Sequence, residues 1–177
     1  MIKLMSIIKI FIVLVTFVCA LSVDFLEENT ESNGVANCTI WQVATLSGYD
    51  NLGGDDRHPG SLAEWTGTTD RFLTDIPVVS IHSKDWKSSK YHVIQIKRNN
   101  QIHKVQSWDL CDDRDCGGCC TRNAKKFGGN FLLDVDKRTL INVFGISHWD
   151  QTLEKVEFNI CESFDPKPIA KKYGLHQ

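Results

Sequence analysis

The sequence has few of the features that direct a protein to nucleic acid, phosphate ligands or metals. It carries 20 basic and 22 acidic side chains, so it lacks the basic face that nucleic-acid binding requires and the polybasic stretch that favours anionic membranes. It has no phosphate-cradling glycine loop, because Gly53-Gly54 and Gly117-Gly118 are turn material. Its six histidines are scattered without metal-ligand spacing. We therefore expect no metal, no cofactor and no nucleic-acid partner.

Long apolar runs are also missing, apart from one at the N-terminus. Lys3 and Lys9 precede the run from Ile10 to Leu21, and Ala20-Leu21-Ser22 offers small residues for cleavage. This is the signal-peptide pattern, and a run of about a dozen residues is shorter than the ~20 of a spanning helix. We predict that residues 1–22 are cleaved, that the protein is extracellular, and that it has no membrane contact afterwards. The alternative is a membrane anchor.

Cysteine usage agrees with export. Cys19 leaves with the signal, and six cysteines remain: Cys38, Cys111, Cys116, Cys119, Cys120 and Cys161. An even number in an exported chain indicates three disulfides, although six cysteines allow 15 pairings. We expect Cys38 or Cys161 to tie a chain end to the folded domain. The alternative for the four clustered cysteines is a zinc site, which an oxidising compartment disfavours. Asn37-Cys38-Thr39 is a glycosylation sequon, with Asn37 as acceptor.

Composition divides the rest of the chain. Residues 23–36 are polar and acidic, as in a flexible leader, and the domain is expected to span 37–163. Within it, Gly48 to Gly67 is rich in glycine and aspartate and predicts a long surface loop. The tail, 164–177, contains two prolines and is expected to be extended.

Short strands dominate the domain. The strand-like runs are Ile40 to Ser47, Ile76 to His82, Tyr91 to Arg98, Ile102 to Asp109 and Val156 to Cys161, where apolar and polar residues alternate in the last. Asn99-Asn100 can take the positive φ angles of a tight hairpin turn. Thr121 to Phe127 predicts a short helix, and Asp136 could cap a second one that runs through Phe144. This pattern predicts an all-β fold with short helices, in the form of a small barrel.

An ordered series of segments carries a resemblance to a known family. It comprises Val43-Ala44-Thr45-Leu46-Ser47-Gly48, Val78-Val79-Ser80, Lys84-Asp85-Trp86, the hairpin, Val105-Gln106-Ser107-Trp108-Asp109-Leu110-Cys111, and Phe131-Leu132-Leu133-Asp134-Val135. This order resembles the six-stranded double-psi β-barrel of expansins, barwin-like proteins, rare-lipoprotein-A-like proteins and family 45 glycoside hydrolases. The resemblance covers roughly residues 40 to 162.

The resemblance implies a sugar-binding groove that contains Thr45, Asp109 and Asp134, with Asp134 as the residue on which activity depends. Three departures stand out. Cys111 to Asn130 is a cysteine-rich insertion, Asp136 replaces a serine, and the His-Phe-Asp motif and second, carbohydrate-binding domain of plant expansins are missing.

The individual residues leave other possibilities open. Partial desolvation of Asp134 would raise its pKa and let it act as an acid, but it could instead cap a helix or form an ion pair. Asp50 is the candidate second carboxylate, with Tyr49 beside it as a substrate-binding residue. Trp65 and Trp86 are expected in loops, as platforms for sugar rings.

Two further tryptophans, Trp41 and Trp108, are expected in the core.

The leading hypothesis is a secreted, monomeric, expansin-like protein that binds cellulose or a similar cell-wall polysaccharide and loosens it without hydrolysis. One alternative is a family-45-like glycoside hydrolase or a lytic transglycosylase that uses Asp134 as general acid. Another is a non-catalytic, barwin-like binding or defence module, since a fold does not settle an activity.

Overall fold

The structure is a computed structural model that describes residues 38–53 and 59–177, all within the unit Asn37–Gln177. The predicted signal peptide, the acidic leader and the glycosylation site at Asn37 lie outside the described residues. Among those that are described, no helix has both the length and the apolar character needed to cross a bilayer.

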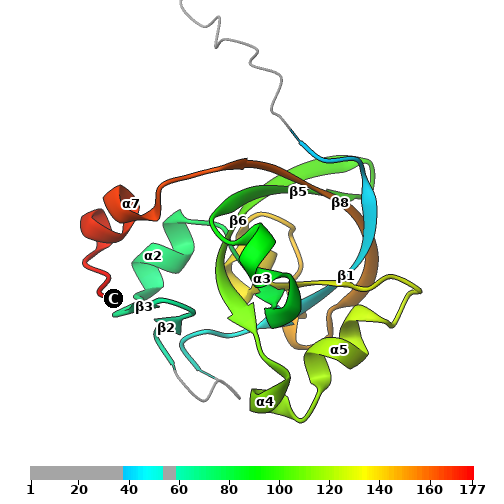
Figure 1. Cartoon of the computed structure of the whole chain (residues 1–177), viewed down its shortest axis with the longest axis horizontal. Coiled ribbons are helices and arrows are strands. Elements are labelled where there is room, and N and C mark those ends of the chain that lie inside the picture. Colours follow the sequence, from blue (N-terminus) through cyan, green and yellow to red (C-terminus); the bar gives the residue numbers. More distant parts are fainter. Residues whose placement is uncertain (1–37, 54–58) are drawn as a thin grey trace, which may run out of the picture. The chain divides into compact units, whose positions relative to one another are not determined.

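Six strands close into a barrel in the order β1-β7-β4-β6-β5-β8 (Figure 1). Their bounds are Gln42–Tyr49 (β1), Val78–His82 (β4), His92–Arg98 (β5), Gln101–Cys111 (β6), Phe131–Asp136 (β7) and Leu153–Ser163 (β8). The pairs β1·β7 and β4·β6 are parallel, and the other four pairs are antiparallel. The predicted all-β fold, a six-stranded double-psi barrel with short helices, is confirmed.

Side chains alternate between the two faces of each strand, and the apolar ones on the inner face fill the barrel. Leu46, Ile81 and Leu133 are fully buried and point inward, where they form one core with Ile94 and Phe158. Burying each such side chain contributes about 1.5–3 kcal/mol. The hairpin between β5 and β6 turns where predicted, at an asparagine pair whose φ angles are 50° and 62°.

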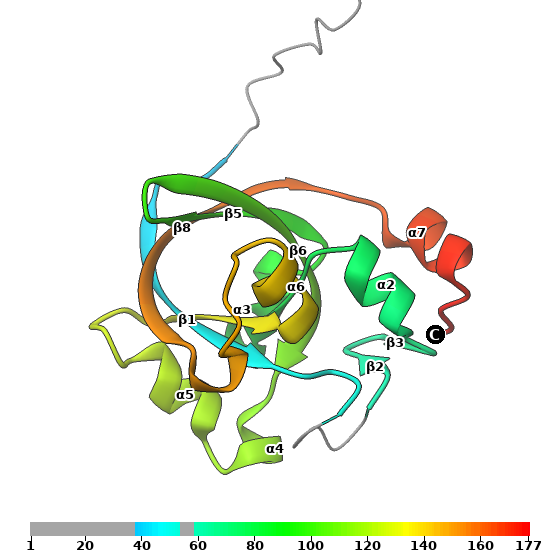
Figure 2. The same cartoon turned by 180° about the vertical axis from the view of Figure 1, so that it is seen from behind.

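The remaining elements are short. They are β2 (Ser61–Leu62), β3 (Trp65–Thr66), α2 (Asp70–Asp75), α3 (Ser83–Ser89), α4 (Asp113–Cys116), α5 (Cys119–Ala124), α6 (Lys137–Asn142), the 3-10 helix η1 (Trp149–Gln151) and α7 (Pro166–Tyr173). Figures 1 and 2 show α3 and α6 at opposite ends of the barrel. Trp86 of α3 and Leu140 of α6 join the barrel core. Asp136 caps α6 as predicted, by accepting a hydrogen bond from the Arg138 amide at 2.8 Å.

Two segments differ from their prediction. The tail is not extended, because it forms α7: Asp165 caps the helix, Pro166 occupies its first position, and Gly174 ends it with a φ of 72°. The predicted surface loop from Gly48 to Gly67 contains β2 and β3, which pair with each other. Both segments fold because they have apolar side chains to bury against the barrel.

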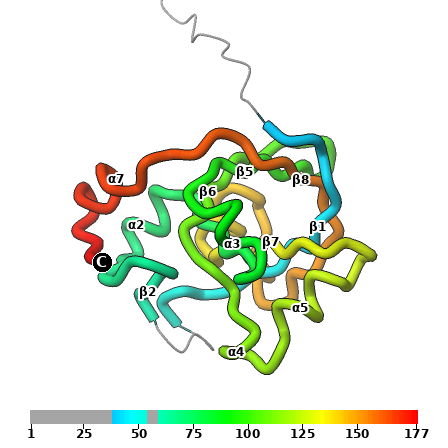
Figure 3. The backbone as a smooth tube through the Cα atoms, viewed as in Figure 1, coloured from blue at the N-terminus to red at the C-terminus, as the bar shows by residue number. Residues whose placement is uncertain are grey.

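A second core lies on the outer side of β6 and joins residues of β2, β3, α2 and α7. Figure 3 shows α2 and α7 on the other side of the barrel from α5. Trp108 is fully buried there, with its ring centroid 5.3 Å from that of Phe72 and 5.4 Å from that of Phe164. The ring of Trp65 packs edge-on at 6.5 Å. Aromatic pairs in this geometry add about 0.5–1.5 kcal/mol beyond the burial of their area.

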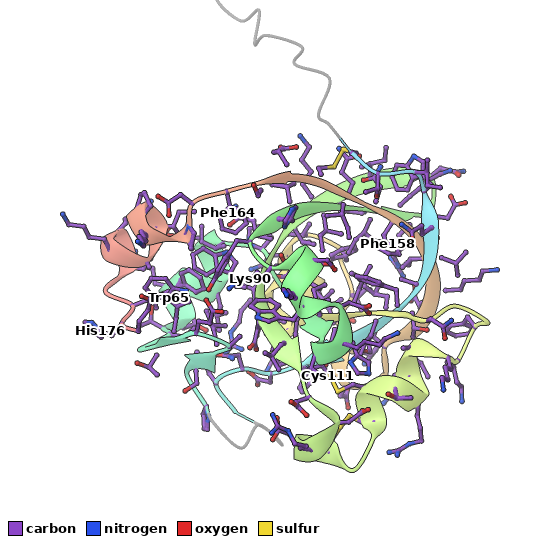
Figure 4. The ribbon with its side chains drawn as sticks, in the orientation of Figure 1. Trp65, Lys90, Cys111, Phe158, Phe164 and His176 are labelled. Atoms are coloured by element: carbon purple, nitrogen blue, oxygen red, sulfur yellow. A yellow bond between two sulfur atoms is a disulfide. The ribbon has the colours of Figure 1, made fainter. Side chains whose placement is uncertain are left out.

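Three disulfides form, as the cysteine count predicts: Cys38–Cys161, Cys111–Cys120 and Cys116–Cys119 (Figure 4). We expected Cys38 or Cys161 to tie a chain end to the domain. They pair with each other and tie the residues before β1 to β8. The Thr39 amide also donates to the Ile160 carbonyl at 2.7 Å.

Candidate functional site

A row of four polar side chains crosses neighbouring strands on the outer face of the barrel. In register, Ser47 of β1 pairs with Asp134 of β7, Asp134 pairs with Ser80 of β4, and Ser80 pairs with Asp109 of β6. Residues paired in register project from the same face of a sheet. We call Ser47, Asp134, Ser80 and Asp109 the polar row.

A β-bulge places Asp109 in this row. Val79 and Ser80 are consecutive on β4, but their partners on β6 are Ser107 and Asp109, so Trp108 is an extra residue. Without the extra residue, strict alternation would put Asp109 on the same inward side as Ser107. The bulge turns Asp109 outward, to the side on which Trp108 already lies by alternation.

Asp134 has an environment suited to proton exchange. The Ser47 hydroxyl donates to its Oδ1 at 2.6 Å. Burial raises the pKa of Asp134 to about 6, against the lowering effect of the Ser47 hydrogen bond. The residue is still partly exposed. Asp134 can therefore donate a proton in mildly acidic solution and accept hydrogen bonds above that range.

Tyr49 adds a hydroxyl beside the row. It lies two residues after Ser47 on β1, and its hydroxyl donates to Asp109 Oδ2 at 3.1 Å. Burial raises the pKa of Tyr49 well above its ordinary value, and the negative charges of Asp109, Asp136 and Asp134 raise it further. The phenol therefore stays protonated, as a donor among carboxylates.

Thr45, expected in the site, makes its hydrogen bond outside the polar row. It is fully buried, and its hydroxyl donates to the Ala124 carbonyl of α5 at 3.5 Å. Ser47 occupies the position next to Asp134. Sequence reasoning missed Ser47 and Ser80, although the two-residue spacing from Thr45 places Ser47 on the same face of the strand.

Asp50, the candidate second carboxylate, is held in ion pairs. It accepts hydrogen bonds from Arg138 Nη1 and, at 3.3 Å, from Lys137 Nζ. Burial acts to raise the pKa of Asp50, but the hydrogen bonds from Arg138 and Lys137 outweigh it and hold that pKa below its ordinary value. Asp50 stays ionised and anchors α6 to the end of β1.

The tryptophans expected to be exposed are buried. Trp65 is 6% exposed in β3 and Trp86 is 9% exposed in α3. Each has a core to enter: the indole of Trp65 donates to the Tyr91 hydroxyl at 3.0 Å, and Trp86 closes one end of the barrel. Trp108 is buried as expected, whereas Trp41 is 40% exposed and lies outside the core.

The cysteine-rich insertion packs on the outer face beside the polar row. Helix α5 contacts β1, β4 and β7, and its residues Cys120 and Ala124 form a small cluster with Leu132 of β7. His82, at the end of β4, hydrogen-bonds Thr121 at 2.9 Å. Among the described residues, every group of side chains close enough to hold a metal contains disulfide-bonded cysteines.

No protein-family model matches the sequence, and no curated protein matches it. Solved structures of an expansin from Clavibacter michiganensis are similar in fold. A mutant form, in complex with cellohexaose, is 9% identical in sequence and has a TM-score of 0.43. The match covers 70% of this chain and 51% of that chain. The apo form is 11% identical and has a TM-score of 0.40, and the match covers 71% of this chain and 52% of that chain. The similarity is one of fold. This chain spans about half the length of those structures.

Proposed function

We propose that this domain binds a structural polysaccharide at the polar row and loosens it without hydrolysis, in the manner of expansins. The observation that carries the proposal is the convergence of two carboxylates, two serine hydroxyls and the Tyr49 phenol on one face. Carboxylates accept hydrogen bonds and hydroxyls both donate and accept them. Sugar hydroxyl groups need both kinds of partner.

The length of the row favours a chain of sugars over a single sugar. Four adjacent strands span about 14 Å between the outer two, at the usual spacing of 4.7–4.9 Å. Asp109 lies at one end of this span and Asp134 lies one strand in from the other end. Both remain partly exposed, whereas Ser47 and Ser80 are buried. The carboxylates would therefore contact the ligand, while Ser47 orients Asp134.

The proposed loosening is non-hydrolytic because Asp50 is engaged elsewhere. The positive charges of Arg138 and Lys137 balance the negative charge of the Asp50 carboxylate and keep that carboxylate ionised. That leaves Asp134 as the proton donor, and binding needs only its hydrogen bond to a sugar oxygen. Competition for hydrogen bonds between neighbouring polysaccharide chains would be enough to loosen them.

The test is co-sedimentation of the mature domain with insoluble cellulose, and separately with chitin, together with an assay of reducing-sugar release. Asp134→Asn keeps the side-chain shape but removes the titrating proton. Asp75→Asn, an exposed aspartate on α2, is the matched control. We expect binding by the wild type and the control, at least ten-fold weaker binding by Asp134→Asn, and no sugar release. Equal binding by all three proteins would refute the proposal.

One observation favours a hydrolytic alternative. Asp109 and Asp134 are both register partners of Ser80, so their backbones lie about two strand spacings, or ~10 Å, apart. Carboxylates on neighbouring outward side chains can then reach the ~6.5–9.5 Å separation of inverting glycosidases. Asp134 would be the acid and Asp109 the base. Reducing-sugar release that disappears in Asp134→Asn would establish this reaction in place of loosening.

A further inference from the structure

Two disulfides lie against each other in the inserted segment. Cys116–Cys119 closes the four-residue sequence Cys116-Gly117-Gly118-Cys119, and Cys111–Cys120 joins the end of β6 to α5. The Sγ of Cys120 lies 3.8 Å from the Sγ of Cys116 and 3.9 Å from that of Cys119. Thiol–disulfide exchange proceeds by attack of a thiolate on a disulfide sulfur, and these sulfurs are already in contact.

The two bonds differ in accessibility. Cys116 is exposed, whereas Cys120 is fully buried. Cys111, the other partner of the inner bond, is half-buried, so a thiol from solution reaches the outer Cys116–Cys119 bond more easily than the inner one. The Cys119 amide donates toward the Cys116 sulfur at 3.1 Å, and Arg122 donates to the Gly117 carbonyl at 2.6 Å. The amide hydrogen bond favours a thiolate at Cys116 once the outer bond opens, whereas the Asp113 carboxylate, within 4.8 Å of the Cys116 sulfur, opposes it.

We propose that these four cysteines form a thiol–disulfide relay that accepts two electrons from an external dithiol. A thiolate of the dithiol attacks the outer bond and forms a mixed disulfide. Its second thiol then displaces the protein, which leaves Cys116 and Cys119 as thiols and the external dithiol oxidised. The Cys116 thiolate next attacks the Cys120 sulfur. The Cys116–Cys120 bond forms, the Cys111–Cys120 bond breaks, and Cys111 leaves as a thiolate that takes up a proton.

Cys116 performs this second step, and Cys119 does not. Neighbouring Cα atoms are about 3.8 Å apart across a trans peptide, whereas disulfides usually need 4.4–6.8 Å. A bond between the adjacent residues Cys119 and Cys120 would also have to close over a single planar trans peptide, and it is therefore disfavoured. Cys116 lies four residues before Cys120 and has no such restriction.

The exchange changes what the inner bond holds together. Cys111 is the last residue of β6, two residues after Asp109, and Cys120 of α5 packs with Ala124 and with Leu132 of β7. When Cys111 is released, the new bond lies wholly within the insertion. The covalent link between α5 and the strand that carries Asp109 is then lost, next to the polar row.

The test uses two matched variants of the oxidised domain, Cys119→Ser and Cys116→Ser. Each leaves one partner of the outer bond as a free thiol. The proteins are alkylated without reductant at neutral pH, and the labelled cysteines are mapped by peptide mass spectrometry. We expect Cys111 to carry at least five-fold more label in Cys119→Ser than in Cys116→Ser. In Cys116→Ser the label should be on Cys119. Equal labelling of Cys111 in both variants, or its absence from both, would overturn the relay.

Wild-type protein provides a second measurement that does not depend on how the variants fold. After brief exposure to a low concentration of dithiothreitol, the first doubly alkylated species should include one labelled at Cys111 and Cys119, with Cys116 and Cys120 still linked. A first species labelled only at Cys116 and Cys119, or one labelled at Cys38 and Cys161, would refute the proposal.

Discussion

The raised pKa of Asp134 makes its contribution to stability depend on pH in an unusual direction. Folding shifts this pKa from an ordinary 3.8 to about 6. The folded state then binds the proton more tightly than the unfolded state does, so stability falls as the pH rises between these two values. At 1.36 kcal/mol for each pH unit of difference, the ionised carboxylate lowers the free energy of unfolding by about 3 kcal/mol at neutral pH.

The substitution Asp134→Asn removes this dependence. The asparagine carbonyl still accepts the Ser47 hydrogen bond and carries no charge at any pH. We expect the free energy of unfolding of the variant, relative to the wild type, to rise by about 2 kcal/mol between roughly pH 4.5 and pH 7.5. Urea denaturation followed by tryptophan fluorescence at several pH values measures this difference.

The direction of the change is what tests the reasoning, because other mutational effects add a constant at every pH. Asp75→Asn, on the surface of α2, serves as the control, and its difference from the wild type should stay within about 0.5 kcal/mol across the range. A difference between Asp134→Asn and the wild type that is flat with pH, or that falls as the pH rises, would show that Asp134 is not a desolvated carboxyl.

Three further outcomes follow from contacts in the structure. Ser47→Ala should raise the pKa of Asp134 further, because the serine hydroxyl lowers it, and a carboxyl NMR titration reads this directly. Asp50→Asn should cost about 2–3 kcal/mol at neutral pH. Since the pKa of Asp50 is lowered, this loss of stability should disappear only in acid, below about pH 4. Urea denaturation at several pH values measures it. Replacing Cys38 and Cys161 by serine opens a loop of 123 residues and should cost up to about 5 kcal/mol, as thermal unfolding would show.

Local sequence patterns predicted the elements of the barrel well. Strand alternation and the Asn99-Asn100 turn depend on neighbouring residues, and they gave the β5–β6 hairpin and the inner face of β8. Asp136 was identified as a helix cap for the same reason. The signals for α7 were also local, with Asp165 and Pro166 at its start and Gly174 after its end, but the prolines were interpreted as breakers of structure.

The site was harder to predict because its residues meet through pairings between distant strands. The resemblance named Asp109 and Asp134, and the structure places both beside Ser80. Ser80 has no sequence feature that marks it as a partner of these carboxylates, and Ser47 has only its two-residue spacing from Thr45. The error with Trp65 and Trp86 has the same origin, because whether a tryptophan in a turn-rich segment is exposed depends on what packs over it.

The position of Asp109 shows how the accessory segments support the candidate site. Counting by alternation from Val105 would turn Asp109 inward, and the bulge at Trp108 reverses this. The same count places Trp108 on the outer face, where a second core receives its ring. That core is built from β2, β3, α2 and α7, which include the segments that composition identified as a loop and a tail. The aromatic cluster therefore packs on the bulged residue itself, directly beside the carboxylate of β6 that lies in line with Asp134.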